Sequence, residues 1–135
     1  MKNVIILIIC LFSLKNTKAQ VLDTSIYINQ IVSNKNLYIG KSFSYLEQNL
    51  KIKLKFFTPL PSFSYDKTKE TNTTFGFLNP VSPEDFSFPR IYITWMQPLN
   101  ATTSMDLYGK YDGGMWAPEL STFYGGAIIK DIKAD

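Results

Sequence analysis

The chain has 135 residues, and its 14 basic and 11 acidic side chains give a formal net charge of +3. Three lysines, Lys2, Lys15 and Lys18, precede residue 20, so the rest of the chain carries 11 basic and 11 acidic residues and is neutral. Nucleic acids and anionic membrane surfaces bind positively charged proteins. We therefore expect no nucleic acid among the partners of this protein.

Thiol and imidazole chemistry is almost absent, since the chain has no histidine and its one cysteine is Cys10. Beyond residue 19 this excludes disulfides, His or Cys zinc sites, cysteine nucleophiles and Ser-His-Asp triads. Paired carboxylates such as Asp106 and Asp112 remain available for glycoside hydrolysis. A chain this short leaves little material for a substrate cleft, so we expect a protein without catalytic activity, cofactor or metal.

The N-terminus has the layout of a secretory signal peptide. Lys2 supplies the positive charge, Val4 to Leu14 form a largely apolar run, and Thr17-Lys18-Ala19 places small residues at the cleavage site. The apolar run is too short to cross a bilayer, which takes about 20 residues. We expect cleavage after Ala19, a single domain over residues 20–135 without a membrane span, and a periplasmic or secreted location.

Two stretches resemble known sequences. The Ala19-Gln20 junction and the lysine-first leader, ahead of a body rich in Lys, Asn and Ile, resemble signal peptides of Bacteroidetes-type bacteria, which implies export from a Gram-negative cell. Gly40-Lys41-Ser42, followed by an apolar helix stripe, resembles the opening of a short helix in PASTA domains and in outer-membrane assembly lipoproteins related to beta-lactamase inhibitor proteins. Helix capping alone explains the second pattern, and neither stretch identifies a functional family.

Two short helices are expected near the start of the domain. Asp23 is a suitable cap for the first, and Ser42, or Ser44 with Glu47, for the second. Apolar residues three and four positions apart form the buried stripes of these helices: Ile28, Ile31 and Val32, then Phe43, Leu46 and Leu50.

Strand patterns follow the helices. Alternation of apolar and polar residues predicts strands over residues 51–56, 73–78, 90–96 and 123–132. Pro59 and Pro61 are expected to end the first strand. Helices grouped before consecutive strands indicate an α+β fold, with two N-terminal helices packed on one face of a roughly four-stranded antiparallel sheet. The side chains expected to face the helices are Ile52, Leu54, Phe56, Ile91, Ile93 and Trp95.

The candidate site lies in residues 106–116, where three large aromatic side chains and two carboxylates occur among three glycines. We interpret this segment as a loop that presents the side chains of Tyr108, Lys110, Tyr111, Asp112 and Trp116. Tyr and Trp supply rigid contact area at protein interfaces, and their ring faces also stack on sugars. A third interpretation is that Tyr108 and Trp116 fold inward and serve only packing.

The sequence therefore favours an exported, non-catalytic binding or interaction module of the cell envelope, with a protein partner favoured over a glycan. An immunity or inhibitor protein is a narrower version of this hypothesis. The alternative is a carbohydrate-binding or carbohydrate-active envelope protein.

Overall fold

The computed structural model describes residues 23–61, 66–79 and 87–134. The predicted signal peptide and its cleavage site lie outside these residues. A helix over residues 23–33 comes first. The elements after it are η1 (Lys35–Leu37), α2 (Phe43–Asn49), β1 (Phe56–Pro61), β2 (Lys69–Gly76), β3 (Arg90–Asn100), α3 (Ala101–Lys110), α4 (Pro118–Gly125) and β4 (Ile129–Ala134).

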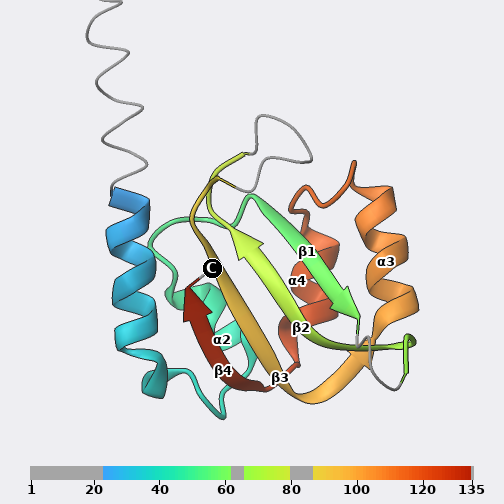
Figure 1. Ribbon diagram of the computed structural model, residues 1–135, viewed down its shortest axis with the longest axis horizontal. Helices are drawn as coiled ribbons and strands as arrows, with labels where there is room; N and C mark the ends of the chain where they lie inside the picture. Colours follow the sequence, from blue (N-terminus) through green and yellow to red (C-terminus); the bar gives the residue numbers. More distant parts are fainter. Residues whose placement is uncertain (1–22, 62–65, 80–86, 135) are drawn as a thin grey trace, which may run out of the picture.

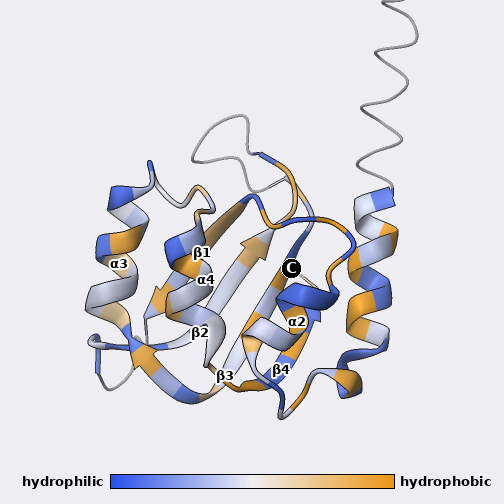
Figure 2. Ribbon diagram, turned by 180° about the vertical axis from the view of Figure 1, so that it is seen from behind, coloured by the Kyte–Doolittle hydropathy of each residue, from blue (hydrophilic) through white to orange (hydrophobic). Residues whose placement is uncertain are grey.

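The strands form one antiparallel sheet in the order β1-β2-β3-β4. This confirms the predicted α+β class and the antiparallel sheet. Figures 1 and 2 show α2 and α4 on the same face of the sheet, and α3 beside the edge formed by β1. Within the described ranges, no helix crosses the opposite face (Figure 1).

Two helices lie between β3 and β4, so the predicted order of helices followed by strands is wrong. The predicted strand over residues 123–132 is also wrong in its first part, because α4 continues to Gly125 and β4 begins at Ile129. Local signals explain both helices. The Asn100 side chain accepts a hydrogen bond of 3.0 Å from the Thr103 N–H and caps α3, and Pro118 occupies the first turn of α4.

The first strand starts later than predicted. Residues 51–55 lie outside regular secondary structure, although the expected alternation persists, with Lys53 exposed and Leu54 buried. β1 begins at Phe56 and continues through Pro59 to Pro61, so these prolines do not end it. Proline is tolerated here because β1 is an edge strand, where a missing N–H donor does not break a ladder on both sides.

The core fills the space between the sheet and the helices. Its fully or nearly buried members include most of the predicted residues: Ile28, Ile31, Phe43, Leu46, Leu54, Ile91, Ile93 and Trp95. Leu50 and Ile52 are partly buried against it. Phe56 is an exception to the prediction: it is buried but lies outside this cluster, because its ring covers Gly76 across the ladder. Its neighbour Phe57 takes the inward position.

The helix over residues 23–33 carries alternating hydrophobic and hydrophilic positions (Figure 2). The ring of Tyr27 meets the ring of Phe77 edge to face, with centroids 5.9 Å apart. The Tyr27 hydroxyl accepts a hydrogen bond of 2.7 Å from the backbone N–H of Lys51. These contacts join the helix to Lys51, which follows α2, and to Phe77, which follows β2.

Both outer edges of the sheet are partly closed by other segments. At β1, the Phe57 N–H donates to the Gly114 carbonyl, and the Trp116 N–H donates to the Lys55 carbonyl, just before the strand. At β4, Ile129 exchanges hydrogen bonds with the backbone of Gly40 and Lys41. Pairing of this kind reduces the exposed backbone that would otherwise attract another strand.

Candidate functional site

The predicted site residues surround the connection between α3 and α4, but only part of this segment is a loop. Tyr108 and Lys110 belong to the last turn of α3, and Tyr111 is its C-cap. Asp112 lies in the turn that follows, and Trp116 lies just before α4. The prediction of a continuous loop is therefore wrong, because the capping signal at Asn100 outweighs the single helix-interior glycine, Gly109.

The turn after α3 is closely packed. Asp112, Gly113 and Gly114 all have positive φ angles, of 51°, 76° and 109°. The Gly114 N–H donates to the Tyr111 carbonyl at 3.0 Å, and a side chain at Gly114 would come within 2.2 Å of the Phe57 carbonyl oxygen. Glycine at this position thus lets the turn press against β1.

Tyr108 and Trp116 pack against the core. The ring centroid of Tyr108 lies 5.9 Å from that of Phe57. The ring of Trp116 lies between 5.7 and 6.2 Å from those of Phe43, Phe57 and Phe75. Both side chains are half-buried, so their principal contacts are internal, as the packing interpretation expects.

Lys110 and Tyr111 form a polar cluster together with Glu119 at the start of α4; Lys110 and Glu119 are exposed, and the Tyr111 side chain is half-buried against the core. The Glu119 carboxylate accepts hydrogen bonds from the Lys110 ammonium at 2.5 Å and from the Tyr111 hydroxyl at 2.7 Å. The Lys110 ammonium also lies 5.3 Å from the centre of the Tyr111 ring. We call Lys110, Tyr111, Asp112 and Glu119 the recognition turn.

Hydrogen bonding within this cluster moves the pKa of each of the three groups further from neutral pH. The hydrogen bond from Lys110, followed by that from Tyr111, lowers the pKa of Glu119. The same bonds to Glu119 raise the pKa of Lys110 and the pKa of Tyr111. The three groups therefore keep their ordinary charges over a wide pH range around neutrality. Glu119 was missed in the sequence, where its acidic position after Pro118 indicates only a helix start.

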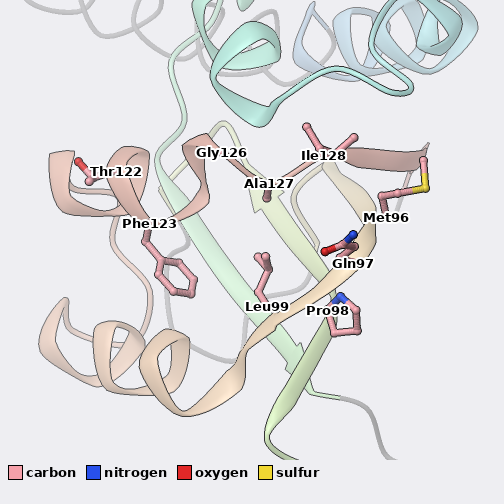
Figure 3. Close-up of a pocket in the computed structure, with 9 residues that line it drawn as sticks. All are labelled: Met96, Gln97, Pro98, Leu99, Thr122, Phe123, Gly126, Ala127 and Ile128. Atoms are coloured by element: carbon pink, nitrogen blue, oxygen red, sulfur yellow. The ribbon is translucent and has the colours of Figure 1, made fainter.

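A groove lies between the last part of β3 and the end of α4. Its cavity volume is about 480 Å³. Figure 3 shows the side chains of Leu99 and Phe123 facing this space, with Met96, Ala127 and Ile128 around it. Met96 and Ile128 are exposed, and the lining contains no charged residue. The polar side chains in this lining are those of Gln97 and Thr122, and both are uncharged.

A buried carboxyl lies inside the fold, between the sheet and helices α3 and α4. Glu70 is fully buried, and its Oε1 atom accepts hydrogen bonds from the hydroxyls of Thr73 and Tyr124. Its Oε2 atom has no hydrogen-bond partner in the described part of the chain. Desolvation raises the pKa of Glu70, and the neighbouring hydroxyls of Ser104, Thr73 and Tyr124 oppose this rise only partly.

The Glu70 network extends into the aromatic core. The Trp95 indole N–H donates to the Thr73 hydroxyl at 2.8 Å, and the rings of Trp95 and Tyr124 stack with centroids 5.7 Å apart. Burial is also the largest cause that raises the pKa of Tyr124. The Glu70 carboxyl is fully buried, so this network joins the sheet to α3 and α4 within the core.

Comparisons with protein-family models, with curated proteins and with solved structures find no match for this chain. Among the residues that the structure describes, no helix has the length and apolar character needed to cross a membrane. Across the same residues, acidic side chains nowhere gather in threes as a metal site would require. Function has to be argued from the surface itself.

Proposed function

We propose that this protein is an exported, non-catalytic binding module of the cell envelope, and that it recognises a protein partner through the recognition turn. The observation that carries the proposal is the arrangement of Tyr111. Its ring and hydroxyl are held by Lys110 and Glu119 at the surface, while the backbone beside it is fixed by the Gly114 contact with β1.

A side chain held in this way loses little conformational entropy when a partner covers it. Tyrosine is among the residues that contribute most to binding at protein interfaces, partly for this reason. Charges of both signs surround the ring, which favours a partner with a complementary polar rim. Met115, which follows the turn and forms a β-bridge with Phe56, is 39% exposed and adds an adaptable apolar contact.

The carbohydrate-binding alternative receives less support at the recognition turn. A sugar stacks on an open aromatic face, but Trp116 and Tyr108 direct their rings to Phe57. Only Tyr111 remains available, and its ring is already approached by the Lys110 ammonium. A protein partner, which needs one anchored ring among polar contacts, fits this arrangement better.

The proposal is tested by site-specific crosslinking in the native host. A photoreactive amino acid in place of Asp112 should capture one envelope protein in stoichiometric amount, whereas the same group in place of Lys53 should not. Tyr111→Ala should weaken that capture about thirtyfold, which corresponds to the loss of a central aromatic anchor. The melting temperature should stay nearly unchanged. If Tyr111→Ala instead lowers the melting temperature strongly while the folded fraction still binds, the turn serves packing and the proposal fails.

Export from the cytoplasm is the second part of the proposal. Its support is the sequence of the leader, with Lys2, the apolar run and Ala19 at the cleavage position. Mass analysis of the chain isolated from the native host should show that residues 1–19 have been removed. Recovery of the full-length chain from the cytosol would contradict export.

The third part concerns the N-terminal helices. We propose that residues 20–135 fold as one domain in which the helix over residues 23–33 and α2 cover the same face of the sheet. The support is that Ile28 and Ile31 share one buried cluster with Phe43 and Leu46. The processed chain should then unfold in a single thermal transition, with the same midpoint by circular dichroism and by tryptophan fluorescence.

A further inference from the structure

A second polar surface lies beyond the β4 edge of the sheet, whereas the recognition turn lies at the β1 edge (Figure 1). It is a shallow groove of about 130 Å³ between the helix over residues 23–33, η1 and the end of α2. Its principal lining residues are Tyr27, Asn34, Leu37, Tyr38, Asn49 and Lys51. We call this surface the tyrosine groove. The lining of this groove combines aromatic rings, side-chain amides and one lysine.

Three side-chain amides line the groove, those of Gln30, Asn34 and Asn49, and the last two are oriented by hydrogen bonds within the protein. The Asn34 side-chain nitrogen donates to the Gln30 carbonyl at 2.9 Å, and the Asn49 side-chain nitrogen donates to the Tyr45 carbonyl at 2.7 Å. Because each amide nitrogen donates to a backbone carbonyl, the Oδ1 atom of each side chain remains as an acceptor. Both residues are exposed, so a ligand hydroxyl has access to these oxygens.

The Tyr27 hydroxyl complements these acceptors with a donor. It accepts the Lys51 backbone N–H at 2.7 Å, which leaves its own proton free to donate. The groove thus offers the amide oxygens of Asn34 and Asn49 as acceptors and the Tyr27 hydroxyl as a donor, next to the Gln30 amide. A ligand that carries several hydroxyl groups, each both donor and acceptor, satisfies such a set.

Apolar contact comes from Tyr38 and Leu37. Leu37 is 61% exposed, although a leucine gains by burial. The ring of Tyr38 is half-buried and lies 6.3 Å from the ring of Tyr45, measured between centroids. Burial is the main cause that raises the pKa of Tyr38, so this side chain stays neutral at physiological pH. An aromatic face beside an exposed leucine suits the C–H face of a sugar ring.

Charge narrows the choice of ligand further. Lys51 is the one charged side chain among the lining residues of this groove, and no lining residue is acidic. Neutral and acidic sugars are therefore accepted, whereas cationic ligands find no counter-charge. The small volume holds one ring and leaves the rest of a chain in solvent.

From these contacts we infer that the tyrosine groove binds one pyranose residue of a neutral or acidic glycan. Asn34 and Asn49 accept from its hydroxyls, Tyr27 donates to a ring or hydroxyl oxygen, and Tyr38 with Leu37 covers its apolar face. This site is independent of the recognition turn, because the two surfaces share no residue and lie at opposite edges of the sheet.

Nuclear magnetic resonance titration of the processed chain tests the inference. The probes are glucose, galactose, N-acetylglucosamine and glucuronate, each added at tens of millimolar, because a single small ring is expected to bind with a millimolar dissociation constant. At least one probe should shift amide signals of Asn34, Leu37, Tyr38 and Lys51 in a saturable manner. The Lys51 amide signal should respond most directly to binding, since the Lys51 N–H donates a hydrogen bond to the Tyr27 hydroxyl.

Three variants complete the test. Tyr38→Ala should weaken sugar binding about tenfold or more. Asn49→Ala changes an exposed side chain and should also weaken sugar binding, so it serves as the test if Tyr38→Ala folds poorly. Lys53→Ala changes an exposed side chain that does not line the groove and should bind like the parent chain. If no probe gives saturable shifts at these amides, or if Asn49→Ala and Tyr38→Ala both bind normally, the inference is wrong. Tyr111→Ala should bind the sugar normally, so failure here is distinct from failure at the recognition turn.

Discussion

Replacing the buried Glu70 by glutamine should remove a pH dependence from the stability of this protein. The carboxyl has no cation beside it among the described residues: the groups that face it are the hydroxyls of Thr73, Ser104 and Tyr124. The Ser104 hydroxyl donates to the Ala101 carbonyl at 3.1 Å, so its lone pairs remain available to a donor on Glu70. A protonated carboxyl, or a glutamine amide, supplies that donor, whereas a carboxylate does not.

The direction of the effect follows from the raised pKa of Glu70 in the folded state. As the pH rises above about 4.5, the ordinary value, the unfolded chain releases this proton before the folded chain does. The free energy of unfolding then falls, by at most about 1.4 kcal/mol per pH unit for one proton. The fall ends at the folded pKa. Well below pH 4.5 Glu70 is protonated in both states, so it adds no pH dependence to the free energy of unfolding there.

Urea unfolding of the parent chain and of Glu70→Gln between pH 4 and 8 measures this contribution. Asp66, Glu119 and Asp131 have lowered pKa values, so their contributions to stability are lost as the pH falls. These contributions are common to both proteins and cancel in the difference. The stability of the parent relative to Glu70→Gln should therefore decrease as the pH rises. If the stability of the parent relative to Glu70→Gln stays constant or increases between pH 4 and 8, the pKa of Glu70 is not raised in the folded state and this reasoning is wrong.

Two further perturbations have matched controls. Gly114→Ala should destabilise the fold by at least about 1 kcal/mol, because the added methyl meets the Phe57 carbonyl and the φ angle is positive. Gly109→Ala is the control: an added methyl at this position in α3 meets open space and should stabilise the fold by about 0.5 to 1 kcal/mol in thermal melts. Leu54→Ala should cost about 2 to 5 kcal/mol in urea unfolding, and Lys53→Ala should cost little. Equal losses within either pair would contradict the burial described for these positions.

Sequence periodicity predicted the parts of the fold where one face of an element is buried. In β3, Ile91, Ile93 and Trp95 alternate with more exposed residues, and all three are buried as expected. Periodicity misplaced Phe56, however, because a glycine across the ladder creates a second place to bury a ring. Gly76 lies opposite Phe56, and this pairing cannot be found without knowing the register of β1 and β2.

The candidate site was predicted less well, since its composition resembled a loop. Gly109, Gly113 and Gly114 suggested an irregular segment, yet the Asn100 cap allows α3 to form up to Lys110. The contact of Glu119 with Tyr111 depends on the angle between two helices, which no local pattern encodes. Signals for the helix starts were present, in Asn100 and Pro118, but they do not reveal what the helices bring together.

The insertion of α3 and α4 also affects the order in which the sheet can assemble. Strands β1, β2 and β3 follow one another along the chain, whereas residues 101–128 separate β3 from β4. Closing this segment costs more chain entropy than closing a hairpin, and such a contact forms more slowly. The pairing of Ile129 with Trp95 and of Ile132 with Ile93 buries two isoleucines only after that closure. We expect β4 to join last, so that the final strand locks the two inserted helices in place.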